Sequence, residues 1–149
     1  MGFIWYHPKV MGNVYMKVTD LTDEKIKGGN MALIFIVSYL FCFFIAVTLQ
    51  FLVIHQFHIS SILFGEPDIM TEGSAANQMM TTFKEAYGDR FRTFGHGALH
   101  GVITAVLFIT PIIGVNALFE RKSFKYILLN GAYWTICVGL MGGVICQFT

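Results

Sequence analysis

The part of the chain from Gly95 to Phe148 consists of two long apolar runs separated by the short charged turn ERKSFK. About 20 helical residues cross the hydrocarbon core of a bilayer, and each run is long enough to do so. The turn between the runs is too short to hold a folded domain. The sequence therefore predicts a transmembrane helical hairpin, around which the rest of the chain must be arranged.

A third apolar run, residues 31–54, contains no charged side chain. Over the whole chain 55% of residues are hydrophobic and 13% are charged, whereas about 25% are charged in a soluble domain. The predicted fold class is therefore all-α: a polytopic membrane helical bundle, forming one transmembrane domain over residues 1–149. We expect its three spans at about 31–54, 95–119 and 126–148.

Short amphipathic helices are predicted outside the spans. After Pro8, the residues Met11, Val14, Tyr15 and Val18 recur at helical spacing, which indicates a helix that lies on the membrane or packs on the bundle.

Two further short helices have recognisable boundaries. Thr22 is the expected N-cap of a helix that ends at Gly28. Periodic apolar residues predict another amphipathic helix over Ser74–Tyr87, ended by Gly88.

Glycine and proline mark the hairpin helices. Gly97 with Gly101, and Gly139 with Gly143, form two GxxxG motifs, which let helix backbones approach closely. Pro111 is expected to kink the first hairpin helix, because proline has no backbone N–H. These motifs predict a packing face but do not identify its partner.

The distribution of Lys and Arg predicts the orientation. Residues 1–30 and 120–125 share one side of a three-span protein and hold most of the basic residues, so the positive-inside rule places them in the cytoplasm. The segment 55–94 and the C-terminus then lie outside. The formal net charge is +1, and no basic run or binding motif suggests nucleic acid as a partner.

Several stretches together resemble a bacterial membrane-protein family known as domain of unknown function 1761. They are GFIWYHP, KVMGNVYMK, LTDEKIKGGNMALIF, FGHGALHG, NALFERKSFKYILLNGAYW and LMGG. The resemblance implies a multi-pass protein of the bacterial cytoplasmic (inner) membrane, usually with four helices. The additional span would precede the WY-x-P motif, and Met1 falls where that span would end. The resemblance implies no activity.

Four histidines are the strongest candidates for chemistry. His55 and His58 follow the first span, and His96 and His100 open the second, so the topology brings all four to one side of the membrane. The i, i+4 spacing places His96 and His100 on one helix face. Such a set could bind zinc, copper or a haem iron, handle protons or a ligand, or simply form hydrogen bonds at the interface.

A second group of polar residues lies at the other end of the hairpin. Asn116 and Asn130 are almost equally far from the turn, so antiparallel helices could pair their amides. Glu120 follows Asn116 at i+4 and is expected to be a charged interface anchor. These residues are also candidates for contacting a ligand or a proton.

No catalytic set is present: the sequence offers no Ser–His–Asp group, no phosphate-binding glycine loop and no paired catalytic carboxylates. No cofactor is required by the sequence, and a metal or haem is the one that the histidines suggest. We therefore expect a non-enzymatic accessory or structural subunit, or a self-assembling membrane protein. One alternative is a small transporter or channel formed by oligomerisation, with Gln50, Asn116, Asn130 and the histidines lining a path between subunits. The other is a metal- or haem-binding protein that uses the histidines. Beside the lipid bilayer, the expected partner is a second copy or a larger membrane complex.

Overall fold

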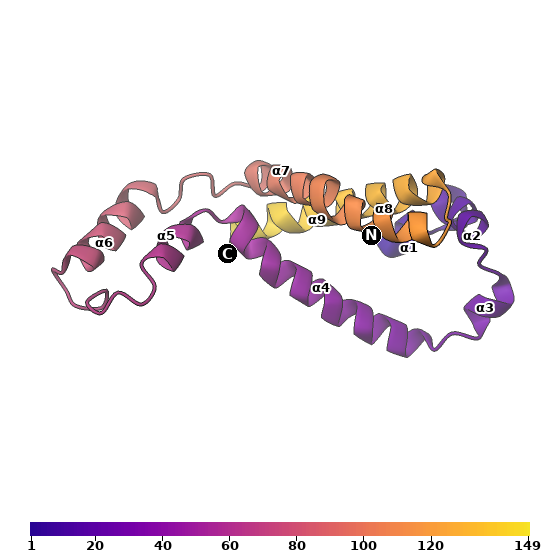
Figure 1. Ribbon diagram of the computed structural model, residues 1–149, viewed down its shortest axis with the longest axis horizontal. Helices are drawn as coiled ribbons and strands as arrows, with labels where there is room; N and C mark the ends of the chain where they lie inside the picture. The colour runs from indigo at the N-terminus through magenta and orange to yellow at the C-terminus, as the bar shows by residue number, and fades with distance from the viewer.

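The computed structural model describes residues 1–149, with the exception of the side chain of Asp23. The chain is all-α, as predicted, and the described residues form no β-strand. Figure 1 shows an elongated molecule in which three long helices lie between two groups of short ones. The α-helices are α1 (Gly2–Trp5), α2 (Asn13–Thr19), α3 (Asp23–Lys27), α4 (Met31–Val53), α5 (Gln56–Ile62), α6 (Ala75–Tyr87), α7 (Phe94–Thr104), α8 (Thr110–Phe119) and α9 (Phe124–Phe148), and the π-helical turns are η1 (Pro8–Gly12) and η2 (Ala105–Ile109).

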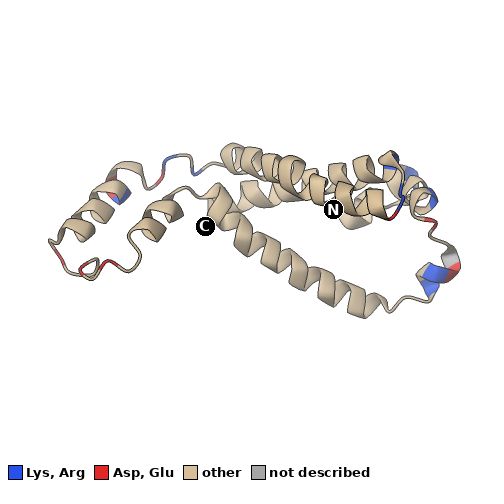
Figure 2. Cartoon of the chain, in the orientation of Figure 1, with Lys and Arg blue, Asp and Glu red and all other residues tan. Residues whose placement is uncertain are grey.

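Three helical segments are long and apolar enough to cross a membrane. They are Met31–Val53, Phe94–Phe119 and Phe124–Phe148, close to the three spans predicted from the sequence. Charged residues gather towards the two ends of the molecule and leave most of the length of the long helices between them uncharged (Figure 2). This distribution is the one that a bilayer requires of helices that span it.

The second long helix contains the irregularity expected near Pro111. The π-helical turn η2, Ala105–Ile109, separates α7 from α8, and Pro111 lies in the first turn of α8. Proline cannot donate to the carbonyl four residues earlier, and its ring crowds that carbonyl. A widened turn immediately before proline relieves this crowding and keeps the helix continuous.

The helices α7 and α9 approach closely through glycine. A Cβ atom on Gly97 would overlap the carbonyl oxygen of Gly142, and one on Gly101 would overlap that of Val138. On the α9 side, a Cβ on Gly142 would in turn overlap the carbonyl oxygen of Gly97. The first GxxxG motif therefore forms the packing face predicted for it, with its backbone directly against the backbone of α9.

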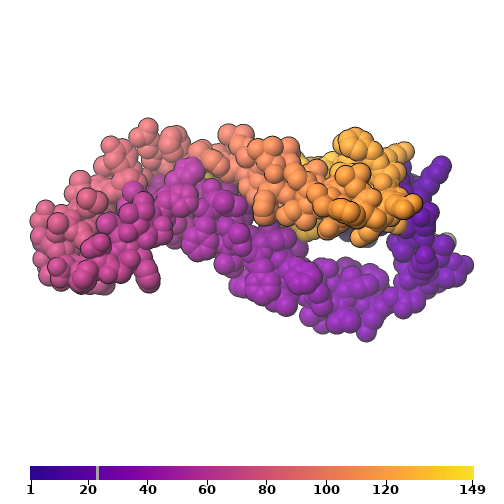
Figure 3. All heavy atoms as spheres, in the orientation of Figure 1, coloured from indigo at the N-terminus to yellow at the C-terminus, as the bar shows by residue number. Residues whose placement is uncertain are grey.

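The helix α4 joins the hairpin only near its C-terminal end. Leu49, Val53 and Ile54 are buried there, in a core completed by Ala105, Val138 and Cys146. Towards its N-terminus α4 diverges from the hairpin, and the space-filling view shows that half standing apart (Figures 1 and 3). Only 6% of the most apolar window of α4 is buried, against 39% for α9.

The N-terminal segment folds back onto the hairpin. The ring of Tyr6 lies 5.0 Å from that of Tyr133 on α9 and 4.6 Å from that of Tyr15 on α2. The amphipathic helix predicted after Pro8 is thus present as η1 and α2, and it packs on the bundle. Burial and the neighbouring phenols raise the pKa of Tyr6 above its ordinary range, so its hydroxyl stays protonated.

Side-chain caps begin several of the helices, and Thr22 occupies the N-cap place that the sequence predicts for it. Thr22 accepts a hydrogen bond from the backbone N–H of Lys25, and Ser74 accepts one from that of Asn77. Thr93 and Ser123 cap α7 and α9 in the same way. Each cap satisfies a backbone donor that has no partner inside its helix, which fixes where the helix begins.

Candidate metal centre

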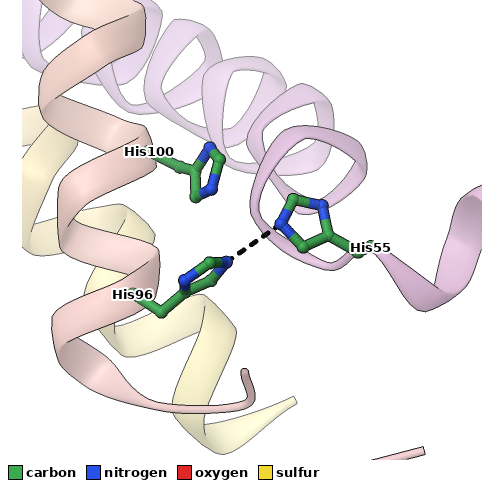
Figure 4. Close-up of side chains that lie close together, drawn as sticks. All are labelled: His55, His96 and His100. Carbon is green, nitrogen blue, oxygen red and sulfur yellow. Dashed lines mark hydrogen bonds between the residues drawn. The ribbon is translucent and has the colours of Figure 1, made fainter. Parts of the chain in front are cut away.

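Three of the four candidate histidines meet where α4 ends and α7 begins. His55, His96 and His100 each offer a ring nitrogen, and these nitrogens all lie within 4.8 Å of one another. The Nε2 atoms of His55 and His96 are 2.9 Å apart, so one ring donates its N–H to the lone pair of the other (Figure 4). We call these three residues the histidine cluster.

The packing of α7 on α9 sets the direction of two of the rings. His96 and His100 directly precede Gly97 and Gly101, the residues whose backbone touches α9. Successive helical residues differ by about 100° around the axis, so the histidines project from a neighbouring face of α7. Figure 4 shows that this face is turned towards His55.

The third ring comes from the joint between α4 and α5. His55 is the N-cap residue of α5 and directly follows the buried residues Val53 and Ile54. The side-chain amide of Gln56 donates hydrogen bonds to the carbonyl oxygens of Tyr87 and Arg90. These bonds tie the joint to the connection between α6 and α7, and so they hold His55 against the other two histidines.

An aromatic residue with an unusual backbone covers one side of the cluster. Phe91 stacks on His96 with ring centroids 4.9 Å apart and an angle of 15° between the planes. Its φ of 64° lies in the left-handed region, which a bulky residue seldom adopts. The guanidinium of Arg90 lies 5.1 Å from the centroid of the Phe91 ring. The strained turn therefore places an apolar ring against a ligand candidate and directs a cation beyond it.

A buried thiol holds the same region together. Cys146 on α9 has no exposed surface, and its Sγ lies 3.4 Å from the carbonyl oxygens of both Val53 and Phe91. It thus connects α9 to the end of α4 and to the turn before α7. These two contacts span 93 and 55 residues of sequence and have no local signal.

The surroundings of the His55 ring favour its neutral form. Burial, followed by the neighbouring rings of His100, His96 and His58, lowers the pKa of His55 below its ordinary value. A neutral imidazole has a free lone pair, which is the form that binds a metal. A hollow of about 290 Å³ lies beside His55 and is lined by Phe83, Tyr87 and Phe91 among others.

His58 does not belong to the cluster. It is exposed, and its ring centroid lies 6.1 Å from that of His55. The four histidines predicted to share one side of the protein thus divide into a group of three and a neighbour. His58 provides a natural comparison for the other three.

The amide pair expected at the other end of the hairpin is not formed among the described residues. Asn130 is buried; its Oδ1 accepts from the Tyr6 hydroxyl at 3.5 Å, and its amide donates to the carbonyl oxygen of Tyr126 at 2.9 Å. Asn116 is exposed on α8. The prediction failed because the N-terminal segment supplies a partner from 124 residues away. Glu120 is exposed and ends α8 as its C-cap residue.

The fold and the comparisons agree on the class of protein. The chain is an all-α bundle whose three apolar helices fit a membrane protein. Residues 1–146 match the family described as "Protein of unknown function (DUF1761)", so the chain belongs to that family, which confirms the resemblance noted in its sequence. Comparisons with curated proteins and with solved structures give no significant match.

Proposed function

We propose that this protein is a multi-pass membrane protein that binds one transition-metal ion, of the Zn²⁺ or Cu²⁺ type, at the histidine cluster. The observation that supports this most directly is the convergence of three ring nitrogens within 4.8 Å. Zinc binds histidine nitrogen at about 2.0–2.1 Å, which places tetrahedral ligands about 3.3–3.4 Å apart. The rings would have to shift to bring all three nitrogens to that separation.

Metal binding would require a change of tautomer at one of the two rings. In the structure one Nε2–H donates across the 2.9 Å contact between His55 and His96. With the proton of the donating ring moved to its Nδ1, both Nε2 atoms would present lone pairs that could hold an ion, at a tetrahedral separation about 0.4 Å longer than the present contact. Three protein ligands leave a fourth position for water or a substrate, which is the pattern of an open metal site.

A bare ion fits this geometry better than haem. The three nitrogens converge on one small volume, whereas haem presents its iron at the centre of a wide planar ring. One face of the His96 ring is already covered by the stacked ring of Phe91. We therefore propose a bare metal ion held by imidazole ligands, and not a haem.

Metal titration of the purified full-length protein tests this function. After treatment with a chelator, calorimetry with Zn²⁺ is expected to give one site per chain. His96→Gln should raise the Kd at least about tenfold, because changes outside the ligand set already cost about 10–100-fold. His58→Gln removes a neighbouring histidine that lies outside the cluster and should leave the Kd unchanged.

Two results would overturn the assignment. Equal losses in His96→Gln and His58→Gln would show that zinc binds loosely to surface histidines. An absence of stoichiometric binding in the wild-type protein would show that the three rings only form hydrogen bonds with one another. Cobalt substitution gives an independent reading, since a tetrahedral Co²⁺ site absorbs visible light strongly.

Self-assembly is a second candidate function, favoured by α4. Its N-terminal half stands apart from the hairpin, and large side chains such as Ile36 and Tyr39 are exposed on it. A second copy could cover this surface inside the bilayer. Cys42 is exposed on the same helix, so a short bis-maleimide should link two copies through it in native membranes. Cys42→Ser is the control, and monomers alone in both samples would refute assembly through α4.

A further inference from the structure

A hollow with a basic lining lies at the opposite end of the molecule from the histidine cluster. It has a volume of about 720 Å³ and lies between α2 and the turn that joins α8 to α9. Figure 2 shows the basic residues gathered around this turn and the neighbouring helix. Its charged lining residues are Lys17, Asp20, Glu120, Arg121, Lys122 and Lys125.

The turn that forms one wall has a defined geometry. Arg121 has a φ of 57°, in the left-handed region, and the N–H of Lys122 donates to the carbonyl oxygen of Ala117 at 2.8 Å. The N–H of Arg121 donates to the carbonyl oxygen of Leu118 at 3.1 Å. These two bonds form a Schellman motif, which occupies carbonyls at the end of α8. The motif fixes the backbone conformation of the turn that carries Arg121 and Lys122.

The charge of the hollow favours an anion. Four basic side chains line it against two acidic ones. A fifth cation lies close by, because the Nζ of Lys25 donates to the backbone carbonyl oxygen of Asp20. The first turn of α9 also faces the same turn, and unpaired N–H groups at a helix start favour negative charge. Arginine together with lysine is the combination that recognises phosphate groups.

Large apolar side chains flank the same turn. Phe119 is 87% exposed and Phe124 is 70% exposed, and both lie at the ends of apolar helices directly beside the charged residues. A phospholipid has this same division, with a phosphate headgroup above hydrocarbon chains. Basic pockets at the ends of membrane helices are a recognised place for anionic headgroups.

We infer that this hollow binds the phosphate headgroup of an anionic phospholipid, whose acyl chains lie along Phe119 and Phe124. The headgroup phosphate pairs with Arg121 and with the ammonium groups of Lys17 and Lys125, which approach from opposite walls. Binding at this point links α2 to the hairpin turn. The site is independent of the histidine cluster and of the metal proposed there.

Thermal unfolding of the full-length protein in a neutral detergent tests the inference. Added phosphatidylglycerol should stabilise the protein saturably, while phosphatidylcholine and inorganic phosphate should not do so over the same range. The double variant Lys17→Gln with Lys125→Gln should weaken phosphatidylglycerol binding by roughly tenfold or more, because each basic residue near an anionic surface contributes about fivefold. Restoring charge with Lys17→Arg and Lys125→Arg should restore binding.

The matched control is Lys9→Gln with Lys27→Gln. It removes the same number of positive charges, from two exposed residues of the N-terminal segment. Neither residue lines the hollow. Equal weakening in the control and in the test variant would overturn the inference, because it would show diffuse attraction to a basic surface. Equal stabilisation by phosphatidylcholine would also overturn it. Stabilisation by inorganic phosphate at the same concentration would show that the ligand of the hollow is a soluble phosphate and not a lipid.

Discussion

The two contacts that hold the long helices together differ in kind. The helices α7 and α9 meet through backbone, at glycines whose Cβ atoms would overlap the opposite helix. The helix α4 meets them through side chains near its C-terminal end, at Leu49 and Val53, and then through the ring of His55. The first contact is a close fit that needs no ligand, whereas the second lies directly beside a set of metal-binding groups.

This difference assigns separate tasks to the two contacts. Close helix packing in lipid depends on van der Waals contact and on small residues, so the hairpin is stable as a unit. The attachment of α4 buries little surface, as its 6% buried window shows. An ion held by His55 on one side and by His96 and His100 on the other would strengthen the weaker contact. Metal binding and helix arrangement are therefore expected to be linked.

The largest expected effect comes from breaking the glycine contact. Alanine at both Gly97 and Gly101 places Cβ atoms against the backbone of α9, and each such overpacking costs about 1–3 kcal/mol. We expect the double variant to lose about 2–6 kcal/mol of unfolding free energy, measured by denaturation in mixed micelles. Alanine at Gly95 and Gly114 is the control. A Cβ atom on Gly95 would meet nothing within 4 Å, and one on Gly114 would only reach ordinary contact with Ile127 Cγ2, at 3.7 Å. Alanine is a better helix former than glycine, so helix propensity alone would stabilise both variants. A similar loss in the control would show that close packing against α9 is not the cause.

The next effect concerns the attachment of α4. Zinc at about one hundred times its Kd should stabilise the folded protein by about 2.7 kcal/mol, if it binds only the folded state. Hydrogen exchange should slow at the end of α4 and at the start of α7, and much less in the N-terminal half of α4.

The control for this prediction separates bridging from simple binding. His55→Gln leaves His96 and His100 on one helix, so any remaining zinc cannot join α4 to α7. The protection of α4 should then disappear, while His58→Gln should keep it. Protection spread evenly over all three long helices would contradict a local bridge.

Much of this architecture could be predicted because it depends on local patterns. Run length and charge located the spans, the side-chain oxygen of Thr22 located the start of α3, and apolar periodicity located α6. The side of the protein on which the histidines gather followed from the alternation of spans. Gly97 and Gly101 indicated a packing face before any partner was known.

The remaining features depend on distant contacts. Which histidines converge depends on the rotation of α7, which the packing of its glycines on α9 sets. The left-handed backbone of Phe91 has no sequence signal, because a bulky residue normally avoids that region. The partner of Asn130 could not be found from spacing along the hairpin, since Tyr6 reaches it from the other end of the chain.

The smallest expected effect compares two equivalent helix caps. Thr93 accepts from the N–H of His96 at 3.3 Å, and Ser123 accepts from the N–H of Tyr126 at the same distance. Replacing either residue with alanine should lower stability by about 1 kcal/mol, the usual cost of losing an N-cap. Only Thr93→Ala should also weaken zinc binding, by up to about tenfold, because it loosens the turn that positions a ligand.

The comparison of these caps tests whether the start of α7 is part of the metal site. Thermal unfolding and zinc titration on the same samples give both quantities, and Thr93→Ser should recover both, because it keeps the accepting hydroxyl. If Ser123→Ala weakened zinc binding as much as Thr93→Ala, the effect would reflect general loosening of the bundle. If neither cap substitution affected zinc binding, the close packing of Gly97 and Gly101 alone would hold His96 and His100 in place.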